Sequence, residues 1–256
     1  MIFRINMLGW WKVTILTAIL VSGLRSLEVM ADTVHKRTLD QLVSKDEPAW
    51  PLVKNWIRLA KNQVEVLPPD IKSRGDVLVQ TQVTTKSPMG ALIYETGGLI
   101  VDHGWLRILG SGHPKLPRSL PGWNRLVGID LGAGPPPFLL VADDVVGGFY
   151  AIDGGSLGKP GNVFYYAPDS LKWEDTGKGY TDFIHFCLSG DLEKYYRDMR
   201  WPGWQADLSK IDGDQGVSIY PFPATLGPKM ASRHRGFVPM SELYGLYVKD
   251  FPRKMF

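Results

Sequence analysis

Histidine and cysteine are few and widely spaced in this chain, which limits the metal and acid–base chemistry that it offers. The 256 residues include five histidines and one cysteine. No two histidines have the His-x-x-x-His spacing that places two zinc ligands on one helix face. His185 and Cys187 are close in sequence, but in a segment with helical periodicity their side chains point about 200° apart. The sequence therefore predicts no metal site, and one cysteine allows no internal disulfide.

Two glycine-containing segments match parts of catalytic or phosphate-binding motifs without the context that these motifs need. Gly154-Gly155-Ser156-Leu157-Gly158 fits Gly-x-Ser-x-Gly, but Lys159-Pro160-Gly161 follows where a nucleophile elbow needs a helix. We interpret this segment as the loop of a hairpin. Gly132-Ala133-Gly134 leads into three prolines instead of a helix, so it is no phosphate-binding loop. No cofactor is therefore expected.

Asp143 and Asp144 are the acidic pair with the most potential for acid–base chemistry. Neighbouring residues of a strand point to opposite faces, so these two carboxylates act on one substrate only if a bulge turns them. The competing interpretation is a strand end or turn, where aspartate accepts local backbone hydrogen bonds. Asp212-Gly213-Asp214 offers two further oxygen ligands, but the twelve-residue pattern of a calcium loop is missing.

Basic and aromatic residues gather in and beside the segment 110–137. Tryptophan and arginine are the residue types that most often anchor protein interfaces. The candidate partner-binding residues are His103, Trp105, Arg107, His113, Arg118, Trp123, Asp143 and Asp144. The competing interpretation is that the tryptophans are buried and that the basic residues between them, Lys115 included, are solvated.

Hydrophobic periodicity and turn residues predict the elements that must position these side chains. A Ser44–Glu47 capping box precedes one of the helices. Helices are expected over Thr38–Val43, Trp50–Ala60, Met89–Glu95, Tyr180–Ser189 and Asp191–Met199, with an amphipathic end at Val238–Phe251. Strands are expected over Val64–Leu67, Asp76–Thr85, Leu99–Asp102, Trp105–Leu109, Phe138–Ala142, Gly148–Asp153, Val163–Ala167, Leu171–Glu174 and Val217–Tyr220. The segment 110–137 is expected to be an irregular loop.

The composition is that of an ordinary globular protein. Hydrophobic residues make up 44% and charged residues 21% of the chain, which excludes a disordered polypeptide. The net charge is +3, from 29 basic and 26 acidic residues. Removing residues 1–29 removes Arg4, Lys12, Arg25 and Glu28, which leaves 26 basic against 25 acidic residues, or +1. Nucleic acid is therefore not an expected partner, because its binding needs a basic stripe.

Residues 1–30 form a leader that differs from the rest of the chain. Its apolar run, Val13–Leu24, is too short for the roughly 20 residues that a membrane-spanning helix needs. Two interpretations stay open. The leader is an upstream extension, with Met30 as the true start of a cytoplasmic protein, or a signal peptide cleaved near Ala31, which gives a periplasmic or secreted protein. A membrane is expected as a partner only if the leader is retained. Residues 31–256 are expected to form a single domain.

Several longer motifs resemble an uncharacterised bacterial family, DUF2625. They are Glu47-Pro48-Ala49-Trp50-Pro51, Ser87-Pro88-Met89-Gly90-Ala91, Asp102–Gly112 and Arg200-Trp201-Pro202-Gly203-Trp204. The segment Phe138–Asp153, with Gly161–Tyr165 and Tyr180–Leu188, is also similar to a pattern of the SUKH superfamily. These resemblances imply an α+β fold, a central antiparallel meander sheet flanked by helices.

The SUKH resemblance also implies a non-enzymatic binding protein, of the immunity type that neutralises a toxin. The alternative function is an enzyme of unfamiliar type in which His103, His113, Asp143 and Asp144 meet in a cleft. Neither family resemblance supplies a catalytic residue, and the sequence does not indicate an oligomeric state.

Overall fold

The computed structural model describes residues 36–132 and 134–250. The predicted leader and its two interpretations lie outside the described residues. None of the helices in these two ranges is long and apolar enough to cross a membrane.

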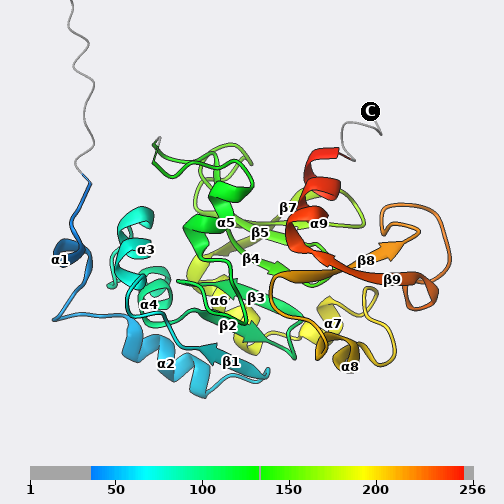
Figure 1. Cartoon of the computed structure of the whole chain (residues 1–256), viewed down its shortest axis with the longest axis horizontal. Coiled ribbons are helices and arrows are strands. Elements are labelled where there is room, and N and C mark those ends of the chain that lie inside the picture. The colour runs from blue at the N-terminus through cyan, green and yellow to red at the C-terminus, as the bar shows by residue number, and fades with distance from the viewer. Residues whose placement is uncertain (1–35, 133, 251–256) are drawn as a thin grey trace, which may run out of the picture. The chain divides into compact units, whose positions relative to one another are not determined.

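An antiparallel sheet forms the centre of the described part of the chain (Figure 1). Its seven strands lie side by side in sequence order, from β1 to β7, so the predicted meander and the α+β fold class are confirmed. A separate two-stranded sheet pairs β8 (Gln215–Tyr220) with β9 (His234–Pro239). The strands of the large sheet are β1 (Val64–Leu67), β2 (Gly98–Val101), β3 (Leu106–Leu109), β4 (Phe138–Asp144), β5 (Phe149–Asp153), β6 (Asn162–Ala167) and β7 (Lys172–Gly179).

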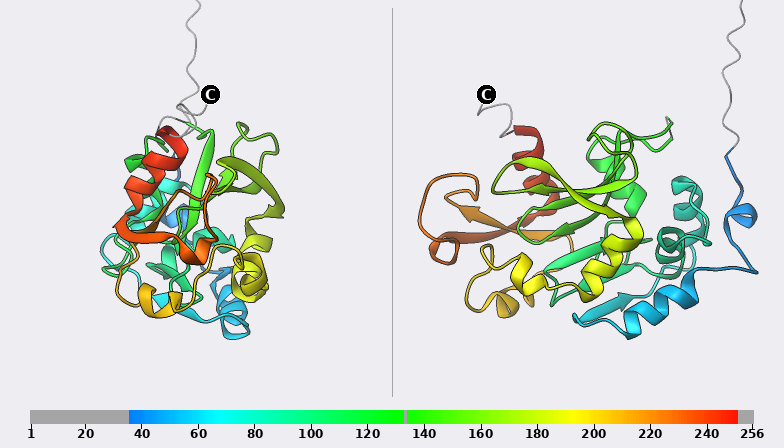
Figure 2. Two further views of the ribbon diagram at one scale, coloured as in Figure 1. Left: turned by 90° about the vertical axis from the view of Figure 1, so that its right-hand side faces the viewer. Right: turned by 180° about the vertical axis from the view of Figure 1, so that it is seen from behind.

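Helices cover both faces of the large sheet (Figure 2). On one face, Trp123 of α5 and Tyr244 of α9 pack against Phe149 of β5. On the other face, Phe183 of α6 packs against Tyr150. The helices are α1 (Leu39–Leu42), α2 (Trp50–Arg58), α3 (Arg74–Thr81), α4 (Pro88–Glu95), α5 (Leu120–Leu126), α6 (Tyr180–Ser189), α7 (Leu192–Tyr195), α8 (Trp204–Leu208) and α9 (Met240–Tyr244), which a π-helix (Gly245–Asp250) continues.

The strand predicted over Asp76–Thr85 is wrong, because this segment lies largely in helix α3. Valine and threonine favour strands by composition, but packing overrides that preference here. Val77 and Leu78 of α3 are buried in the core. The helix ends where Gln82 takes a left-handed conformation, at φ 55°.

The segment 110–137 is not irregular throughout, because it contains helix α5. The Ser119 side chain accepts a hydrogen bond from the Gly122 backbone N–H, and Pro121 lies in the first turn. Helix α4 begins in a similar way, with the Ser87 side chain accepting a hydrogen bond from the Gly90 N–H and Pro88 in the first turn. Asn124 of α5 then binds both backbone groups of Leu140, which fixes the helix on β4.

Three predicted helix boundaries also differ. Helix α2 begins at Trp50 with Ala49 at the N-cap, so the Ser44–Glu47 box forms a turn before the helix and does not cap it. The helix predicted over Asp191–Met199 is limited to α7. The amphipathic end begins as strand, since Val238 and Pro239 pair in β9 before α9 starts.

Candidate functional site

Strand β4 ends with Asp143 and Asp144, and these two side chains point to opposite faces of the sheet. The register pairs Ile100 of β2 with Arg107 of β3, and Arg107 with Asp143. Directly paired residues of antiparallel strands share a face, so these three side chains form one row. The register shift in β4 lies earlier, between Leu140 and Ala142, and leaves the alternation at the two aspartates intact.

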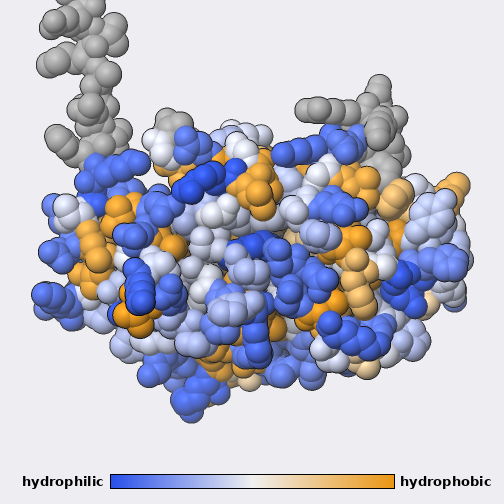
Figure 3. All heavy atoms as spheres, viewed as in Figure 1, coloured by the Kyte–Doolittle hydropathy of each residue, from blue (hydrophilic) through white to orange (hydrophobic). Residues whose placement is uncertain are grey.

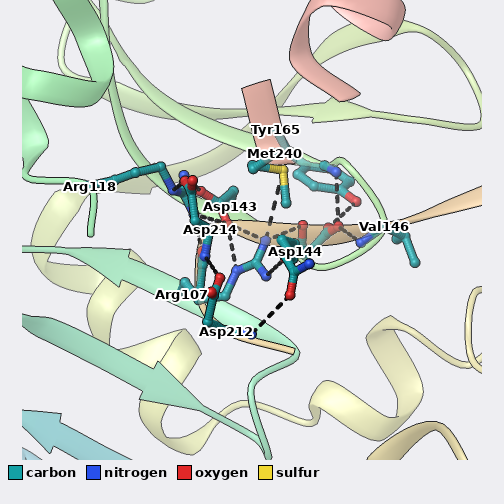
Figure 4. A network of polar contacts seen from close by, with 12 residues as sticks. Arg107, Arg118, Asp143, Asp144, Val146, Tyr165, Asp212, Asp214 and Met240 are labelled. Atoms are coloured by element: carbon teal, nitrogen blue, oxygen red, sulfur yellow. Dashed lines mark hydrogen bonds and ion pairs between the residues drawn. The ribbon is translucent and has the colours of Figure 1, made fainter. Parts of the chain in front are cut away.

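Asp143 forms ion pairs with two arginines (Figure 4). Arg107 donates from Nε to Oδ1 at 2.7 Å, and Arg118 donates from Nη1 to Oδ2 at 2.6 Å. The exposed fraction of all three side chains is 4% or less. Two guanidinium groups on one buried carboxylate leave one net positive charge, which other acceptors must stabilise.

The other N–H groups of the two arginines bind oxygen atoms of residues 213–215, where β8 begins, and the Asp144 carbonyl of β4. Arg107 donates to the carbonyls of Gln215, at 2.8 Å, and Asp144, at 3.1 Å. Arg118 donates to the Gly213 carbonyl at 2.6 Å and forms an ion pair with Asp214 at 3.0 Å. The ionic cluster, defined as Arg107, Arg118, Asp143 and Asp214, therefore connects the large sheet to the two-stranded sheet. Burial lowers the pKa of Arg107, but the Asp143 charge opposes this change.

Among the described residues, no arginine forms an ion pair with the Asp144 carboxylate. Its Oδ1 accepts hydrogen bonds from the backbone N–H groups of Val146 and Gly148, at 3.0 and 2.8 Å. Its Oδ2 accepts a hydrogen bond from the Tyr165 hydroxyl at 2.7 Å. Burial raises the pKa of Asp144 to about 6, although these hydrogen bonds oppose the shift. A Cβ at Gly148 would collide with this carboxylate and with the Tyr165 ring, so the turn needs glycine there.

The two aspartates therefore serve different structural roles. The interpretation of a turn fits Asp144, which organises the β4–β5 turn, whereas the sequence did not indicate that Asp143 is the centre of a buried ion pair. Because the carboxylates lie on opposite faces, they do not form a pair that acts on one substrate.

A cleft of about 400 Å³ opens beside the ionic cluster. Its floor is the row of paired residues Glu65, Ile100 and Arg107. Its walls come from Lys115 and from residues 205–213. Glu65 and Lys115 form an ion pair at 2.5 Å across this space, with both side chains largely exposed. The polar groups of the floor are thus already engaged with partners inside the protein.

His103 lies at the rim of this cleft, in the turn between β2 and β3. Asp102, His103 and Gly104 all have positive φ, at 51°, 56° and 91°. This left-handed turn is held by the Gln63 side chain, which accepts a hydrogen bond from the His103 N–H at 3.0 Å. The His103 ring contacts Trp204 edge to face, with centroids 5.9 Å apart. His113 is not among the lining residues of the cleft, so the structure does not bring the two histidines together there.

Six of the eight candidate partner-binding residues are buried. The competing interpretation is confirmed for the tryptophans, because Trp105 and Trp123 are at most 1% exposed. It is wrong for Arg107 and Arg118, which are not solvated. The buried six are Trp105, Arg107, Arg118, Trp123, Asp143 and Asp144, whereas His103 is exposed and His113 is half-buried. Partner binding by these eight residues stays a prediction.

Arg200 packs on the buried Trp105, and the sequence indicated this arginine only as part of a family motif, without a role. Its guanidinium carbon lies 5.0 Å from the Trp105 ring and 4.4 Å from the Trp204 ring. It also forms ion pairs with Asp102 and Glu193. An arginine directly before the Trp201–Trp204 motif was the available signal for this aromatic–cation cluster. Across residues 36–132 and 134–250, no group of three His, Cys, Asp or Glu side chains is placed to hold a metal ion.

Residues 201–213, which we call the ridge, separate the cleft from a second groove. Gln205, Leu208 and Ser209 of the ridge line the cleft. Trp201, Asp207 and Lys210 line the second groove, which has a volume of about 490 Å³. The far wall of the second groove is basic and comes from the start of β9 and the preceding loop, with Arg233, His234, Arg235 and Phe237.

Comparison with known proteins places this chain among relatives of unknown function. The family model described as "Protein of unknown function DUF2625" matches residues 39–243. The uncharacterized protein YbfG of Escherichia coli (strain K12) is 41% identical over 214 residues, which is 81% of this chain and 94% of that protein. An uncharacterized protein of Haemophilus influenzae (strain ATCC 51907 / DSM 11121 / KW20 / Rd) is 45% identical over 180 residues, which is 70% of this chain and 79% of that protein.

Proposed function

We propose that this chain, which belongs to the DUF2625 family of proteins of unknown function, is a non-enzymatic protein-binding module of the immunity-protein type. The observation that carries the proposal is the ridge at residues 201–213 with a groove on each side. A surface with this relief fits a polypeptide better than it fits one small molecule.

The size of this surface supports a protein partner. Within the described part of the chain, 13 residues line the cleft and nine line the second groove. A stable interface involves about 20–30 residues on each side. The face of the molecule in Figure 3 carries hydrophilic residues interspersed with small apolar areas. Some proteins form complexes but are also stable alone. Their interfaces typically combine polar groups with a few isolated apolar anchor residues.

The second groove has a wall held in place by hydrogen bonds, and exposed aromatic side chains near it can anchor a partner. The Arg233 guanidinium donates hydrogen bonds to the carbonyls of Pro221, Phe222, Thr225 and Pro228, and so fixes the loop between β8 and β9. A loop ordered before binding loses less conformational entropy when a partner docks. Aromatic side chains are partly exposed near this loop: Phe237 is 44% exposed and Tyr220 is 63% exposed.

The acid–base groups favour binding over the alternative, an enzyme that uses His103, His113, Asp143 and Asp144. Both aspartates are fully buried, and their oxygens accept hydrogen bonds from arginine, tyrosine and backbone groups. No observation on the described residues brings a second free acid or base to the exposed His103. The immunity type rests on the SUKH resemblance alone, and the compartment depends on the leader.

Affinity capture from the source bacterium tests the proposal. The wild-type chain is compared with Lys210→Glu/Arg235→Glu, which reverses two charges of the second groove. The matched control is Lys54→Glu/Lys172→Glu, the same charge change at two exposed lysines outside both grooves. We expect one protein to be retained by the wild type and the control and lost by the groove variant. Equal retention by all three chains, or no specific protein, contradicts the proposal.

The immunity type has its own test. The captured protein is expressed alone and together with this chain. We expect growth inhibition that co-expression with the wild type relieves and co-expression with the groove variant does not. A captured protein that does not affect growth leaves protein binding intact but contradicts the immunity type.

A further inference from the structure

A third cavity, of about 270 Å³, lies on the opposite face of the sheet from the ionic cluster. It opens between the β5–β7 part of the sheet and the helices α6 and α7. Five aromatic side chains line it: Tyr150, Tyr165, Phe183, Phe186 and Tyr195. We call this cavity the aromatic pocket.

The sheet register and the helix period together explain why these rings converge. Tyr150 pairs with Tyr165, and Tyr165 pairs with Glu174 of β7, so the three side chains share one face. Phe183 and Phe186 are three residues apart on α6 and therefore lie on one side of it. Tyr195 of α7 closes the set, with its ring centroid 5.1 Å from that of Phe186 and 6.0 Å from that of Tyr165.

Two carboxylates, those of Glu174 and Asp144, lie near the aromatic rings. Glu174 and Asp175 of β7 line the pocket. Asp175 alternates with Glu174 on β7 and forms an ion pair with Lys159 at 2.7 Å, so Glu174 is the carboxylate of β7 that shares a face with the rings. Asp144 lies behind Tyr165 and accepts its hydroxyl hydrogen bond. Burial raises the pKa of Tyr195 to about 12, and the charges of Asp144 and Glu174 act in the same direction.

The chain already places one ammonium group at this pocket. Lys178 lines it, with Nζ 5.6 Å from the centroid of the Phe186 ring. The same Nζ donates a hydrogen bond to the Thr176 carbonyl at 3.2 Å. Faces of aromatic rings attract cations, most strongly where water is excluded. The residues around the pocket thus favour a cation, and Lys178 is an internal competitor for it.

We propose that the aromatic pocket binds an alkylammonium group. The rings supply cation–π attraction, and Glu174, which shares their face of the sheet, supplies the opposite charge. The group is the side chain of a lysine in a polypeptide or the head of a free quaternary amine, since both present the same chemistry. This site lies away from the ridge, so it does not depend on the proposed protein-binding surface.

Nuclear magnetic resonance titrations of the full-length protein test the charge requirement. The probes are choline, Nα-acetyl-lysine methylamide, and 3,3-dimethyl-1-butanol as the neutral isostere of choline. We expect choline, the lysine derivative or both to shift the backbone signals of Phe183, Phe186 and Tyr195. Comparing the two cations identifies the source of the group. Equal shifts with the neutral alcohol, or no shifts at these residues with either cation, overturn the proposal.

Variants of the lining residues test whether the pocket prefers a positively charged ligand. Glu174→Gln weakens binding of the cation, whereas Lys178→Met tightens it because a competing ammonium is removed. Tyr195→Ala weakens binding roughly three- to tenfold, as expected for the loss of one cation–π partner. The control is Tyr220→Ala, an exposed tyrosine on β8, which leaves the affinity unchanged. If Lys178→Met weakens binding and Glu174→Gln tightens it, the pocket takes an anion and the proposal is wrong.

Discussion

The two faces of β4 present the same residue type in opposite electrostatic settings. Asp143 lies between two guanidinium groups, with hydrogen bonds of 2.6 and 2.7 Å. Asp144, the next residue, accepts only backbone N–H groups and the Tyr165 hydroxyl. The alternation of a strand is enough to place one carboxylate in an ionic cluster and the other beside an aromatic pocket. Proximity in sequence therefore says nothing about a shared chemical role at this position.

The two faces of β4 also differ in how the protein stabilises a buried carboxyl group. On the Asp143 face, two guanidinium groups form ion pairs with the carboxylate. On the Asp144 face, burial raises the pKa to about 6, so the proton is held more easily. An ion pair is sensitive to the loss of either partner, whereas a carboxyl that readily takes a proton tolerates a neutral replacement.

The largest expected effect is that of Asp143→Asn. The change leaves Arg107 and Arg118 buried without a negative partner, and breaking a buried ion pair costs about 3–5 kcal/mol of the free energy of unfolding. The matched variant is Asp144→Asn, which keeps an oxygen acceptor for the turn and changes the free energy by about 1 kcal/mol or less at neutral pH. Urea unfolding of both variants measures the difference. Similar losses in the two would show that the faces are equivalent.

The pH dependence of stability isolates Asp144. Its pKa in the folded protein, about 6, lies above the ordinary value of 3.8. Between these pH values the folded state holds a proton that the unfolded chain has released, so the free energy of unfolding falls as the pH rises from about 4 to about 6. The fall amounts to about 3 kcal/mol.

Asp144→Asn lacks this titration, so subtracting its unfolding free energy from that of the wild type removes the contributions of other groups. The difference curve is predicted to decline over that window and to be flat above it. A difference that is constant or rises with pH is incompatible with a raised pKa at Asp144.

Removal of the Tyr165 hydroxyl has an intermediate effect. Tyr165→Phe deletes a donor to a buried carboxylate, and hydrogen bonds to charged groups contribute about 1.5–3 kcal/mol. Tyr196→Phe deletes one partner of the 2.7 Å contact between the Tyr150 and Tyr196 hydroxyls, which are both neutral. We expect the second loss to be about 1 kcal/mol. Thermal unfolding at pH 8 ranks the two, and a larger loss for Tyr196→Phe would argue against a charged Asp144 at that pH.

The smallest effect belongs to the ion pair in the cleft. Lys115 and Glu65 are 62% and 46% exposed, and such surface pairs contribute about 0–1 kcal/mol. Lys115→Met is therefore expected to change stability by less than about 1 kcal/mol, and salt reduces the difference further. Chemical denaturation at low and high salt checks this. A loss as large as that of Asp143→Asn would extend the structural ionic cluster into the cleft.

Local sequence patterns were sufficient to predict most strands of the large sheet and the opposite orientations of Asp143 and Asp144. The segments Phe138–Ala142 and Gly148–Asp153 were predicted as neighbouring strands of an antiparallel meander, which the register of β4 and β5 confirms. The alternation rule also placed Asp143 and Asp144 on opposite faces. Both predictions need only near neighbours in the chain, and this is why the sequence supports them.

Interactions between distant segments were not predictable in the same way. Helix α3 depends on the burial of Val77 and Leu78, which no local pattern shows. Arg118 looks like a surface residue in a proline-rich segment, but it meets Asp143, 25 residues later, and Asp214, 96 residues later. The aromatic pocket likewise unites strands and helices that only the folded chain brings together. Two signals were local in the sequence: Ser119 and Pro121 at the start of α5, and Arg200 directly before Trp201.

The separation of the two aspartates is tested most directly by a nuclear magnetic resonance titration of the full-length protein with carbon-13 at the aspartate Cγ. We predict one aspartate resonance with a midpoint near pH 6, assigned to Asp144 by its absence in Asp144→Asn. Asp143→Asn should leave that midpoint close to its wild-type value. If no aspartate titrates above pH 5, or if Asp143 and Asp144 titrate together as a coupled pair, the separation of the two faces is contradicted.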